Sequence, residues 1–298
     1  MFFTYQETHE NQALLSVSRQ QQTVSQSDFL EGSGLFTGEK CFLRLCPAPV
    51  NTGVLFKRID LPKNKYIPAT LDFVQATPRC TLLGDHEVRV QTVEHLLAAL
   101  KAYEIDNVIV EISGSEIPIL DGSSMLFVDL IEKCGIVEQD LPLHAKTLEQ
   151  PVYFSQGDIH LIAIPSDEYR ISYTLHYPNS SLLRAQFYST VINPETFKRE
   201  IAPCRTFALY EEIAPLVEKG LIKGGGLENA LIIKDGAILN PEGARFPEEM
   251  ARHKVLDLVG DLSLMGISFT AHIIAIRSGH ASNVQFARKL LNQITMES

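Results

Sequence analysis

The sequence predicts an α+β protein made of two units with a similar plan. In each half of the 298 residues, several short strands come before the helices, which is the order typical of layered α+β folds. A hydrophobic content of 45% is sufficient for a substantial core. Residues 137–151 are polar and carry two prolines, so we place a boundary near residue 145. We therefore expect one domain over residues 1–142 and another over residues 148–298.

The first half begins with short strands over residues 14–60. CFLRLCPAP and TGVLFKRIDL are predicted strands, and EGSGLFTGEK is a glycine-rich break. A helix is expected from about Thr92 to Tyr103, with Thr92 as its N-cap residue. An apolar strand, NVIVEI, follows, and a second helix ends at Gly135.

The second half repeats this style with four predicted strands, VYFSQ, DIHLIAIPS, EYRISYTLHYP and FYSTVI. Helices are expected near Glu195 and from about Glu211 to Lys219, before the strand ALIIKDG. A longer helix, RHKVLDLVGDL, precedes an apolar strand, a turn that carries His280, and a C-terminal helix. The repetition is one of architecture, because no residue-level repeat is visible.

Charge and cysteine usage narrow the class of protein. The net charge of −10 argues against nucleic acid and anionic membranes as partners. The five cysteines form no CxxC pair, so we expect reduced, buried thiols in a cytoplasmic protein. The start MFFTYQETHENQALL lacks the features of a signal peptide, and no apolar run approaches the length of a membrane span. We expect a monomer that acts on a small molecule.

The helix RHKVLDLVGDL carries the strongest chemical signal. His253, Asp257 and Asp261 follow one another at intervals of four residues. On an α-helix each interval completes one turn plus only about 40°, so the three side chains form one polar stripe. His253 and Asp257 can share one metal ion. Asp261 lies about 12 Å along the axis from His253, so we expect it to support a neighbouring group instead.

A hydrolytic metal centre needs three protein ligands and one open position, and this helix supplies only two ligands. His95 is a candidate for the third, although a lone histidine on an apolar helix is more often a core residue. Glu94 beside it favours the catalytic interpretation, because a carboxylate next to a ligand can take a proton from water.

Three further features each have a purely structural and a functional interpretation. His280 is either an exposed turn histidine or an imidazolium that Asp261 stabilises. Lys254 is either a solvated surface lysine or an inward donor to an oxyanion. The glycines 224–226 lack the spacing of known phosphate loops, so a hinge or a close backbone approach is favoured there.

Five motifs occur in the order TVEHLLAAL, EIPILDGSS, CRTFAL, RHKVLDLVGDL and SGHASN. With these, the chain resembles the UDP-3-O-acyl-N-acetylglucosamine deacetylases of lipid A biosynthesis over nearly its full length. The resemblance implies a zinc amidase that removes acetate from UDP-3-O-(3-hydroxyacyl)-N-acetylglucosamine, the committed step toward lipid A. It also implies two β/α/α/β sandwich domains packed face to face, with the active site between them.

The resemblance also implies roles for single residues. His95, His253 and Asp257 correspond to the zinc ligands, and iron(II) would suit the same set. Glu94 corresponds to the general base. The remaining catalytic roles fall to His280 as the positive group at the oxyanion, Asp261 as its orienting partner, Thr206 as a hydroxyl that polarises the carbonyl, and Lys254 as a substrate contact.

For the substrate, the resemblance implies an apolar passage for the acyl chain between Leu209 and Gly226. Phe207 would form a wall of the sugar site. The nucleotide-facing strand end, LHYPNSS, differs from the usual family pattern, and there we expect Tyr177 to stack on uracil and Arg277 to meet phosphate. One departure is Phe36, which stands in GLFTG where the family usually has a histidine. The passage residues expected from this resemblance are Leu209, Ile213, Ile222 and Gly225.

Two other functions share part of this pattern. The first is a zinc amidohydrolase acting on another acyl amide, which would need the metal site but neither the acyl passage nor the nucleotide site. The second is a non-catalytic sugar-nucleotide binding protein, in which His253 and Asp257 only stabilise a buried helix.

Overall fold

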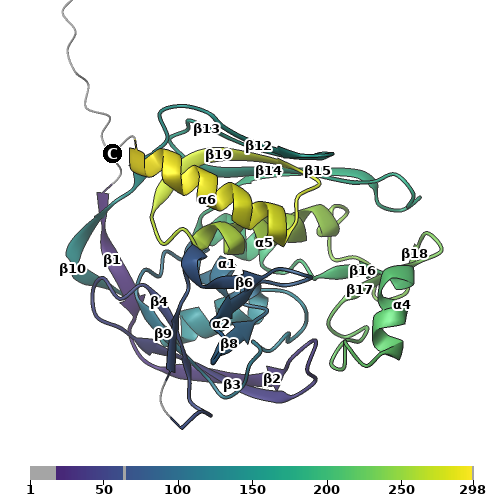
Figure 1. Ribbon diagram of the computed structural model, residues 1–298, viewed down its shortest axis with the longest axis horizontal. Coiled ribbons are helices and arrows are strands. Elements are labelled where there is room, and N and C mark those ends of the chain that lie inside the picture. The colour runs from purple at the N-terminus through teal and green to yellow at the C-terminus, as the bar shows by residue number, and fades with distance from the viewer. Residues whose placement is uncertain (1–17, 63–64, 297–298) are drawn as a thin grey trace, which may run out of the picture.

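A computed structural model describes residues 18–62 and 65–296, so the N-terminal stretch examined for a signal peptide lies outside the described residues. The predicted α+β class is confirmed. Two sheets form the outer layers, and helices from both domains fill the space between them (Figure 1). The β/α/α/β order of layers therefore describes the whole molecule, because each domain supplies one sheet and one layer of helices.

The N-terminal domain is built on a five-stranded sheet with the order β2-β3-β9-β4-β5. The central strand β9 is parallel to β4 and antiparallel to β3, and the outer pairs are antiparallel. A small sheet of β6, β7 and β8 lies between β5 and the first helix in the chain. The elements are β2 (Asp28–Ser33), β3 (Lys40–Pro47), β4 (Val54–Arg58), β5 (Lys65–Pro68), a 3-10 helix η1 (Leu71–Phe73), β6 (Val74–Ala76), β7 (Leu82–Gly84), β8 (Arg89–Gln91), α1 (Glu94–Ala102), β9 (Val108–Ile112) and α2 (Met125–Cys134).

The C-terminal domain has a sheet with the order β12-β13-β19-β14-β15, and the short β11 pairs with the start of β19. A second small sheet, β16-β17-β18, lies with α4 at one end of the molecule (Figure 1). The elements are β11 (Lys146–Thr147), β12 (Val152–Gln156), β13 (Ile159–Ile164), β14 (Tyr169–Tyr177), β15 (Arg184–Val191), α3 (Pro194–Thr196), a π-helix η2 (Phe197–Ile201), β16 (Phe207–Leu209), α4 (Tyr210–Glu218), β17 (Leu231–Lys234), β18 (Ala237–Ile238), α5 (Glu249–Ser263), β19 (Phe269–Ile276) and α6 (His280–Met296).

The two main sheets have the same topology. In each domain the chain first runs through two hairpins, and the last strand of the sheet lies between them. This strand is antiparallel to the adjacent strand of the first hairpin and parallel to that of the second. In each domain one helix precedes this central strand and another follows it. Helices α1 and α5 therefore occupy equivalent positions, as do α2 and α6. The predicted repetition of architecture is confirmed at the level of strand order.

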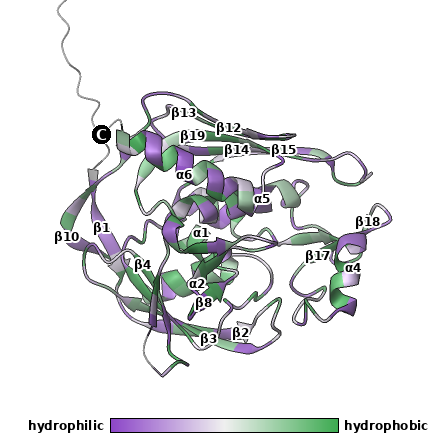
Figure 2. Ribbon diagram, in the orientation of Figure 1, coloured by the Kyte–Doolittle hydropathy of each residue, from purple (hydrophilic) through white to green (hydrophobic). Residues whose placement is uncertain are grey.

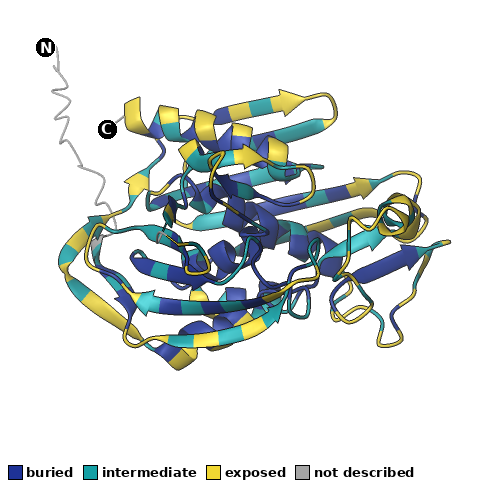
Figure 3. Ribbon diagram, turned by 60° about the horizontal axis from the view of Figure 1, so that its bottom comes forward, coloured by how far each residue is buried: buried dark blue, intermediate teal, exposed yellow. Residues whose placement is uncertain are grey.

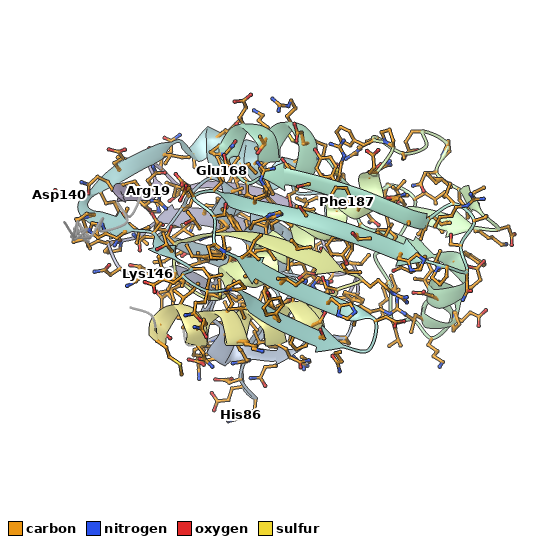
Figure 4. The ribbon with its side chains drawn as sticks, turned by 90° about the horizontal axis from the view of Figure 1, so that it is seen from above. Arg19, His86, Asp140, Lys146, Glu168 and Phe187 are labelled. Atoms are coloured by element: carbon orange, nitrogen blue, oxygen red, sulfur yellow. The ribbon has the colours of Figure 1, made fainter. Side chains whose placement is uncertain are left out.

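The helices lie in the interior because they are apolar on more than one side. Twelve of the fifteen residues of α5 are buried, and so are eight of the nine residues of α1. Figure 2 shows the mixed hydropathy of these helices, and Figure 3 shows that they form the most buried part of the molecule. By contrast, no described helix covers the outer face of the C-terminal sheet, where Phe187 is exposed (Figure 4).

Three local predictions are wrong. The polar segment expected as a linker contains β10 (Ile136–His144), which pairs antiparallel with β1 (Ser18–Val24) in a two-stranded ribbon. Thr92 is not an N-cap residue, because its backbone has a φ of 60° and the helix begins two residues later. His280 lies not in a turn but at the first position of α6. None of the helices within the described residues has the length and hydropathy to cross a membrane.

Candidate active site

The three predicted metal ligands meet between the two helical layers. His95 lies in the first turn of α1, whereas His253 and Asp257 lie one turn apart on α5. One ligand atom of each residue lies within 4.8 Å of the other two, and all three side chains are buried. The Oδ1 atom of Asp257 is 3.4 Å from Nε2 of His253 and 3.8 Å from Nε2 of His95.

The hydrogen bonds around Asp257 and His253 leave one potential ligand atom of each side chain without a hydrogen-bond partner. Oδ2 of Asp257 accepts a 2.6 Å hydrogen bond from Nζ of Lys254, but its buried Oδ1 has no hydrogen-bond partner. Nδ1 of His253 lies 3.0 Å from the carbonyl oxygen of Cys204, which leaves its Nε2 free. A buried polar atom without a partner is costly, so the unpaired oxygen beside two imidazoles fits a cation.

Burial and charge set protonation states that suit metal binding. Burial and the neighbouring His253 lower the pKa of His95 to about 3, so its imidazole is neutral at pH 7. Burial also lowers the pKa of His253. For Asp257, burial would raise the pKa, but the charge of Lys254 and the neighbouring histidines together lower it. Two neutral imidazoles and one carboxylate are the forms in which these side chains bind divalent ions.

Lys254 points inward and is therefore not a solvated surface residue. Its side chain is only 15% exposed. Burial alone would lower its pKa, but the carboxylate of Asp257 raises it. The ammonium is therefore charged and lies beside the metal-binding group.

Glu94 and His280 face each other beside this group. Oε1 of Glu94 is 3.7 Å from Nε2 of His280. Burial raises the pKa of Glu94 to about 7, with further contributions from the charges of Asp261 and Asp257. Burial alone would lower the pKa of His280, but the carboxylates of Asp261 and Glu94 raise it to about 9. A carboxylate poised near neutrality beside an imidazolium is a suitable pair for general acid-base chemistry.

Asp261 holds His280 in place. Its Oδ2 lies 2.8 Å from Nδ1 of His280 and accepts a 2.8 Å hydrogen bond from the amide of Asn283. Its Oδ1 accepts a 2.6 Å hydrogen bond from the hydroxyl of Thr81. The backbone N–H of Thr81 also donates to Glu94 at 3.1 Å. The expected partnership of Asp261 with His280 is present, and Asp261 is not part of the metal-binding group.

Thr81 and Asn283 were missed by the sequence analysis. Asn283 lies one helical turn after His280, so their spacing would have paired them had the start of α6 been known. Thr81 comes from the loop before β7, and nothing in its local pattern points to Asp261.

Close contact between the two helices depends on Gly260. A β-carbon at this position would lie 2.2 Å from the carbonyl oxygen of Glu94, at the start of α1. Only glycine allows the backbone of α5 to approach α1 this closely. That approach brings His95 of one domain to the ligands of the other.

An apolar cavity of about 370 Å³ lies beside the metal-binding group, bordered by β16, α4 and the glycine-rich segment 224–226. Among the predicted substrate residues, Leu209 is not part of its lining and packs against the main core instead. Phe207 connects the cavity to the metal-binding group, since its ring centroid lies 6.5 Å from that of His253. The residues of interest in the lining are Leu35, Phe36, Thr206, Phe207, Ile213, Ile222 and Gly225.

The two predicted nucleotide contacts lie at the ends of neighbouring strands. Tyr177 ends β14, and its ring centroid is 6.2 Å from that of Phe207. Arg277 follows β19 with a φ of 56°, and its guanidinium lies 3.4 Å from the exposed carboxylate of Asp158. Tyr177 therefore borders the same region as Phe207, whereas Arg277 lies at the surface with an acidic partner.

The fold and the site together define a two-domain α+β protein with a buried His-His-Asp group and an adjacent acid-base pair. The family model for UDP-3-O-acyl N-acetylglycosamine deacetylase matches residues 21–292. The chain therefore belongs to the family of UDP-3-O-acyl-N-acetylglucosamine deacetylases, and the expected family is confirmed.

Curated relatives agree with this assignment. The chain is 49% identical over 281 residues to the UDP-3-O-acyl-N-acetylglucosamine deacetylase of Chlamydia pneumoniae, covering 94% of this chain and 100% of that protein. The enzymes of the same name from Chlamydia felis and Chlamydia trachomatis serovar L2 are 48% and 46% identical. These matches cover 93% and 94% of this chain, and 99% and 98% of the relatives.

Proposed function

We propose that the chain hydrolyses the N-acetyl group of UDP-3-O-[(3R)-3-hydroxyacyl]-N-acetylglucosamine and releases acetate; its relatives are named UDP-3-O-acyl-N-acetylglucosamine deacetylases. This is the committed step of lipid A biosynthesis. The observation that carries the proposal is the convergence of His95, His253 and Asp257 beside Glu94 and His280, next to an apolar cavity. A hydrolytic centre and a chain-sized apolar space are the two things that this substrate requires.

Zinc is the proposed metal, since two imidazoles and a carboxylate with room for water form a typical hydrolytic site. Iron(II) suits the same ligands. Lewis acidity toward water and the acetyl carbonyl is the chemistry that such an ion supplies when bound. His95, His253 and Asp257 would hold the ion, and Lys254 would keep Asp257 ionised and oriented through their 2.6 Å hydrogen bond.

Glu94 acts as the general base in this mechanism. Its carboxylate takes a proton from the water that attacks the acetyl carbonyl. The charged imidazole of His280 and the hydroxyl of Thr206 stabilise the oxyanion that forms. The leaving nitrogen then receives a proton, either from His280 or from Glu94, which returns the one it accepted.

The remaining site residues position the substrate. The acyl chain occupies the cavity lined by Phe207, Ile213, Ile222 and Gly225, with Leu209 supporting the wall from behind. Tyr177 stacks on the uracil ring, and Arg277 exchanges its Asp158 partner for a phosphate.

The wider expectations belong to the same proposal. The enzyme acts as a monomer, which is supported by the completion of the metal-binding group within one chain. Its expected location is the cytoplasm. Its domains comprise residues 1–142, with Glu94 and His95, and residues 148–298, with the remaining catalytic groups and the passage.

Acetate release from the acylated UDP-sugar tests this function directly. We expect zinc-dependent release from this substrate and far slower release from its analogue without the acyl chain. Equal rates on unrelated acyl amides would favour a different amidohydrolase. Binding of the sugar nucleotide without any acetate release, with or without added zinc, would favour a non-catalytic binding protein.

A His280→Ala variant tests the acid-base assignment. We expect a loss of about 10²–10⁴-fold in kcat, the range typical of a general acid-base group. The activity of the wild-type enzyme should rise as Glu94 loses its proton and fall as His280 loses its own. Wild-type turnover with an unchanged alkaline limb would rule out the role of His280.

A further inference from the structure

One wall of the apolar cavity comes from the N-terminal domain, although the passage motifs all lie in the C-terminal domain. Leu35 and Phe36 belong to the loop of residues 34–38 between β2 and β3, and both line the cavity. Ile222 and Gly225 of the C-terminal domain line the same cavity, and a β-carbon on Gly225 would lie only 3.4 Å from the side chain of Leu35. The width of the cavity on this side therefore depends on where the N-terminal loop and the adjoining glycine segment are held.

The loop is bound from inside by a single buried carboxylate, that of Glu116. Oε1 of Glu116 accepts a 2.9 Å hydrogen bond from the backbone N–H of Phe36. Oε2 accepts two more, from the backbone N–H of Thr37 at 2.8 Å and from its hydroxyl at 2.7 Å. Gly34 leaves room for this contact, because a β-carbon there would lie 2.2 Å from Oε2.

Glu116 is only 2% exposed, and no described lysine, arginine or histidine forms an ion pair with it. A buried carboxylate without a cation depends on its hydrogen bonds. The loop and the carboxylate therefore fix each other's position, and changing either one alters the other.

The outer side of the same loop binds the glycine segment of the other domain. The backbone N–H of Gly224 donates to the carbonyl of Leu35 at 3.0 Å, and that of Lys223 donates to the carbonyl of Phe36 at 3.2 Å. A β-carbon on Gly224 would lie 2.1 Å from the carbonyl oxygen of Gly34, so the two backbones are in direct contact. The adjoining parts of the lining from the two domains are thus linked to Glu116 through the loop.

We propose that Glu116 is a positioning residue that sets the width of the acyl passage and so determines how strongly the enzyme selects for a long acyl chain. This rests on the proposed function. Glu116 does not contact the metal-binding group, and it acts through the loop of residues 34–38. Its remaining hydrogen bond, from the hydroxyl of Thr92 at 3.2 Å, joins it to the segment before α1.

The variant Glu116→Gln tests the proposal with little change in shape. A glutamine keeps one acceptor oxygen but turns the other into an NH₂ donor, so either Phe36 or Thr37 loses the acceptor for its N–H. We compare kcat/KM for substrates with a long acyl chain and with a chain cut to about four carbons. In the wild-type enzyme each buried methylene can contribute up to about fourfold.

For E116Q we expect kcat/KM to fall at least about tenfold for the long-chain substrate and less than about threefold for the short-chain one. Most of this fall should come from a higher KM. Metal content should stay at the wild-type level. The variant Thr37→Val, which removes one of the donors to Glu116, should shift selectivity in the same direction by a smaller factor. Glu39→Gln is the matched control, since it neutralises an exposed carboxylate of the same segment.

A binding measurement separates failure of this proposal from failure of the proposed function. Calorimetry with a saturated fatty acid of about 12 carbons reports on the cavity without catalysis, and we expect E116Q to weaken binding about tenfold. If E116Q weakens fatty-acid binding but the wild-type enzyme releases no acetate, the proposed function is rejected and the positioning role stands. The positioning role would be overturned if E116Q lowered kcat/KM equally for long and short acyl chains. It would also be overturned if both E116Q and T37V kept the wild-type chain selectivity and fatty-acid affinity.

Discussion

At the scale of single residues, the roles in this site are set by which atoms remain unpaired. Both oxygens of Asp261 accept hydrogen bonds, so this carboxylate orients His280 and has no oxygen left for a cation. Asp257 has the same side chain, but one of its buried oxygens lacks a partner. Two aspartates one turn apart on α5 therefore have different functions because their surroundings differ.

Removing the charge of Asp261 should change the pH dependence of catalysis. Asp261→Asn takes away the negative charge that contributes most to the raised pKa of His280. The pKa should fall from about 9, so the protonated form and the activity should be lost at a lower pH than in the wild-type enzyme. Profiles of kcat/KM against pH measure this shift. An alkaline limb at the same pH in D261N and in the exposed control D140N would contradict it.

Some site residues on helices could be predicted from their spacing in the sequence, whereas site residues on loops have no such spacing. The spacing of His253, Asp257 and Asp261 has helical periodicity, so their common face could be predicted. Adjacency made Glu94 and His95 candidates, but only the resemblance to the family joined them to α5. Side-chain hydrogen bonds from loops have no period, so Thr81 has no recognisable signal, and Glu116 stands out only as the first residue of the motif EIPILDGSS, without an assigned role.

At the scale of elements, the approach of α1 to α5 determines the metal-binding geometry. Gly260 allows this approach, and a side chain there would meet the backbone of Glu94. His95 lies one residue further along α1, so any separation of the helices moves it away from His253 and Asp257.

Replacing Gly260 should therefore weaken both stability and metal binding. Gly260→Ala places a methyl group in a backbone contact that cannot yield easily, with an expected cost of about 1–3 kcal/mol in the free energy of unfolding. Chemical denaturation and metal content after dialysis measure the two effects. Gly114→Ala is the control, because a β-carbon at Gly114 has no atom within 4 Å. Equal stability and metal retention in both variants would contradict this account.

The predicted elements were most accurate where a run of apolar residues is clearly bounded in the sequence. The strands of both main sheets, apart from the unpredicted β5, and the helices α2, α4 and α5 lie close to their predicted positions. The sequence of β10 predicts a linker, because it overlaps the polar segment 137–151 and contains Pro142, whereas in the structure it pairs with β1. The start of α1 was placed too early, because Thr92 adopts the left-handed conformation instead of the extended one of an N-cap.

At the scale of the whole molecule, the repeated topology explains where the site lies. The helix before the central strand is α1 in one domain and α5 in the other, and the two domains pack with these helices in contact. A metal ion held by both helices would therefore link the domains, and its binding energy would stabilise the complete molecule.

Metal removal should accordingly lower the stability of the entire protein. An ion that binds only the folded state at about a thousand times its dissociation constant contributes about 4 kcal/mol. We expect a single unfolding transition whose midpoint falls on treatment with a chelator and recovers with added zinc. If only the C-terminal domain lost stability, or if neither domain did, the ion would not link the two domains.

The most direct test of a metal centre shared by two domains is metal content measured together with acetate release, on the wild-type enzyme and on His95→Gln and His253→Gln. We predict about one divalent ion per chain in the wild-type enzyme, and a parallel loss of metal and acetate release in both variants. The two histidines come from different domains, so equal effects would show that neither domain forms the site alone. Full acetate release by either variant, or by metal-free wild-type enzyme, would contradict the account.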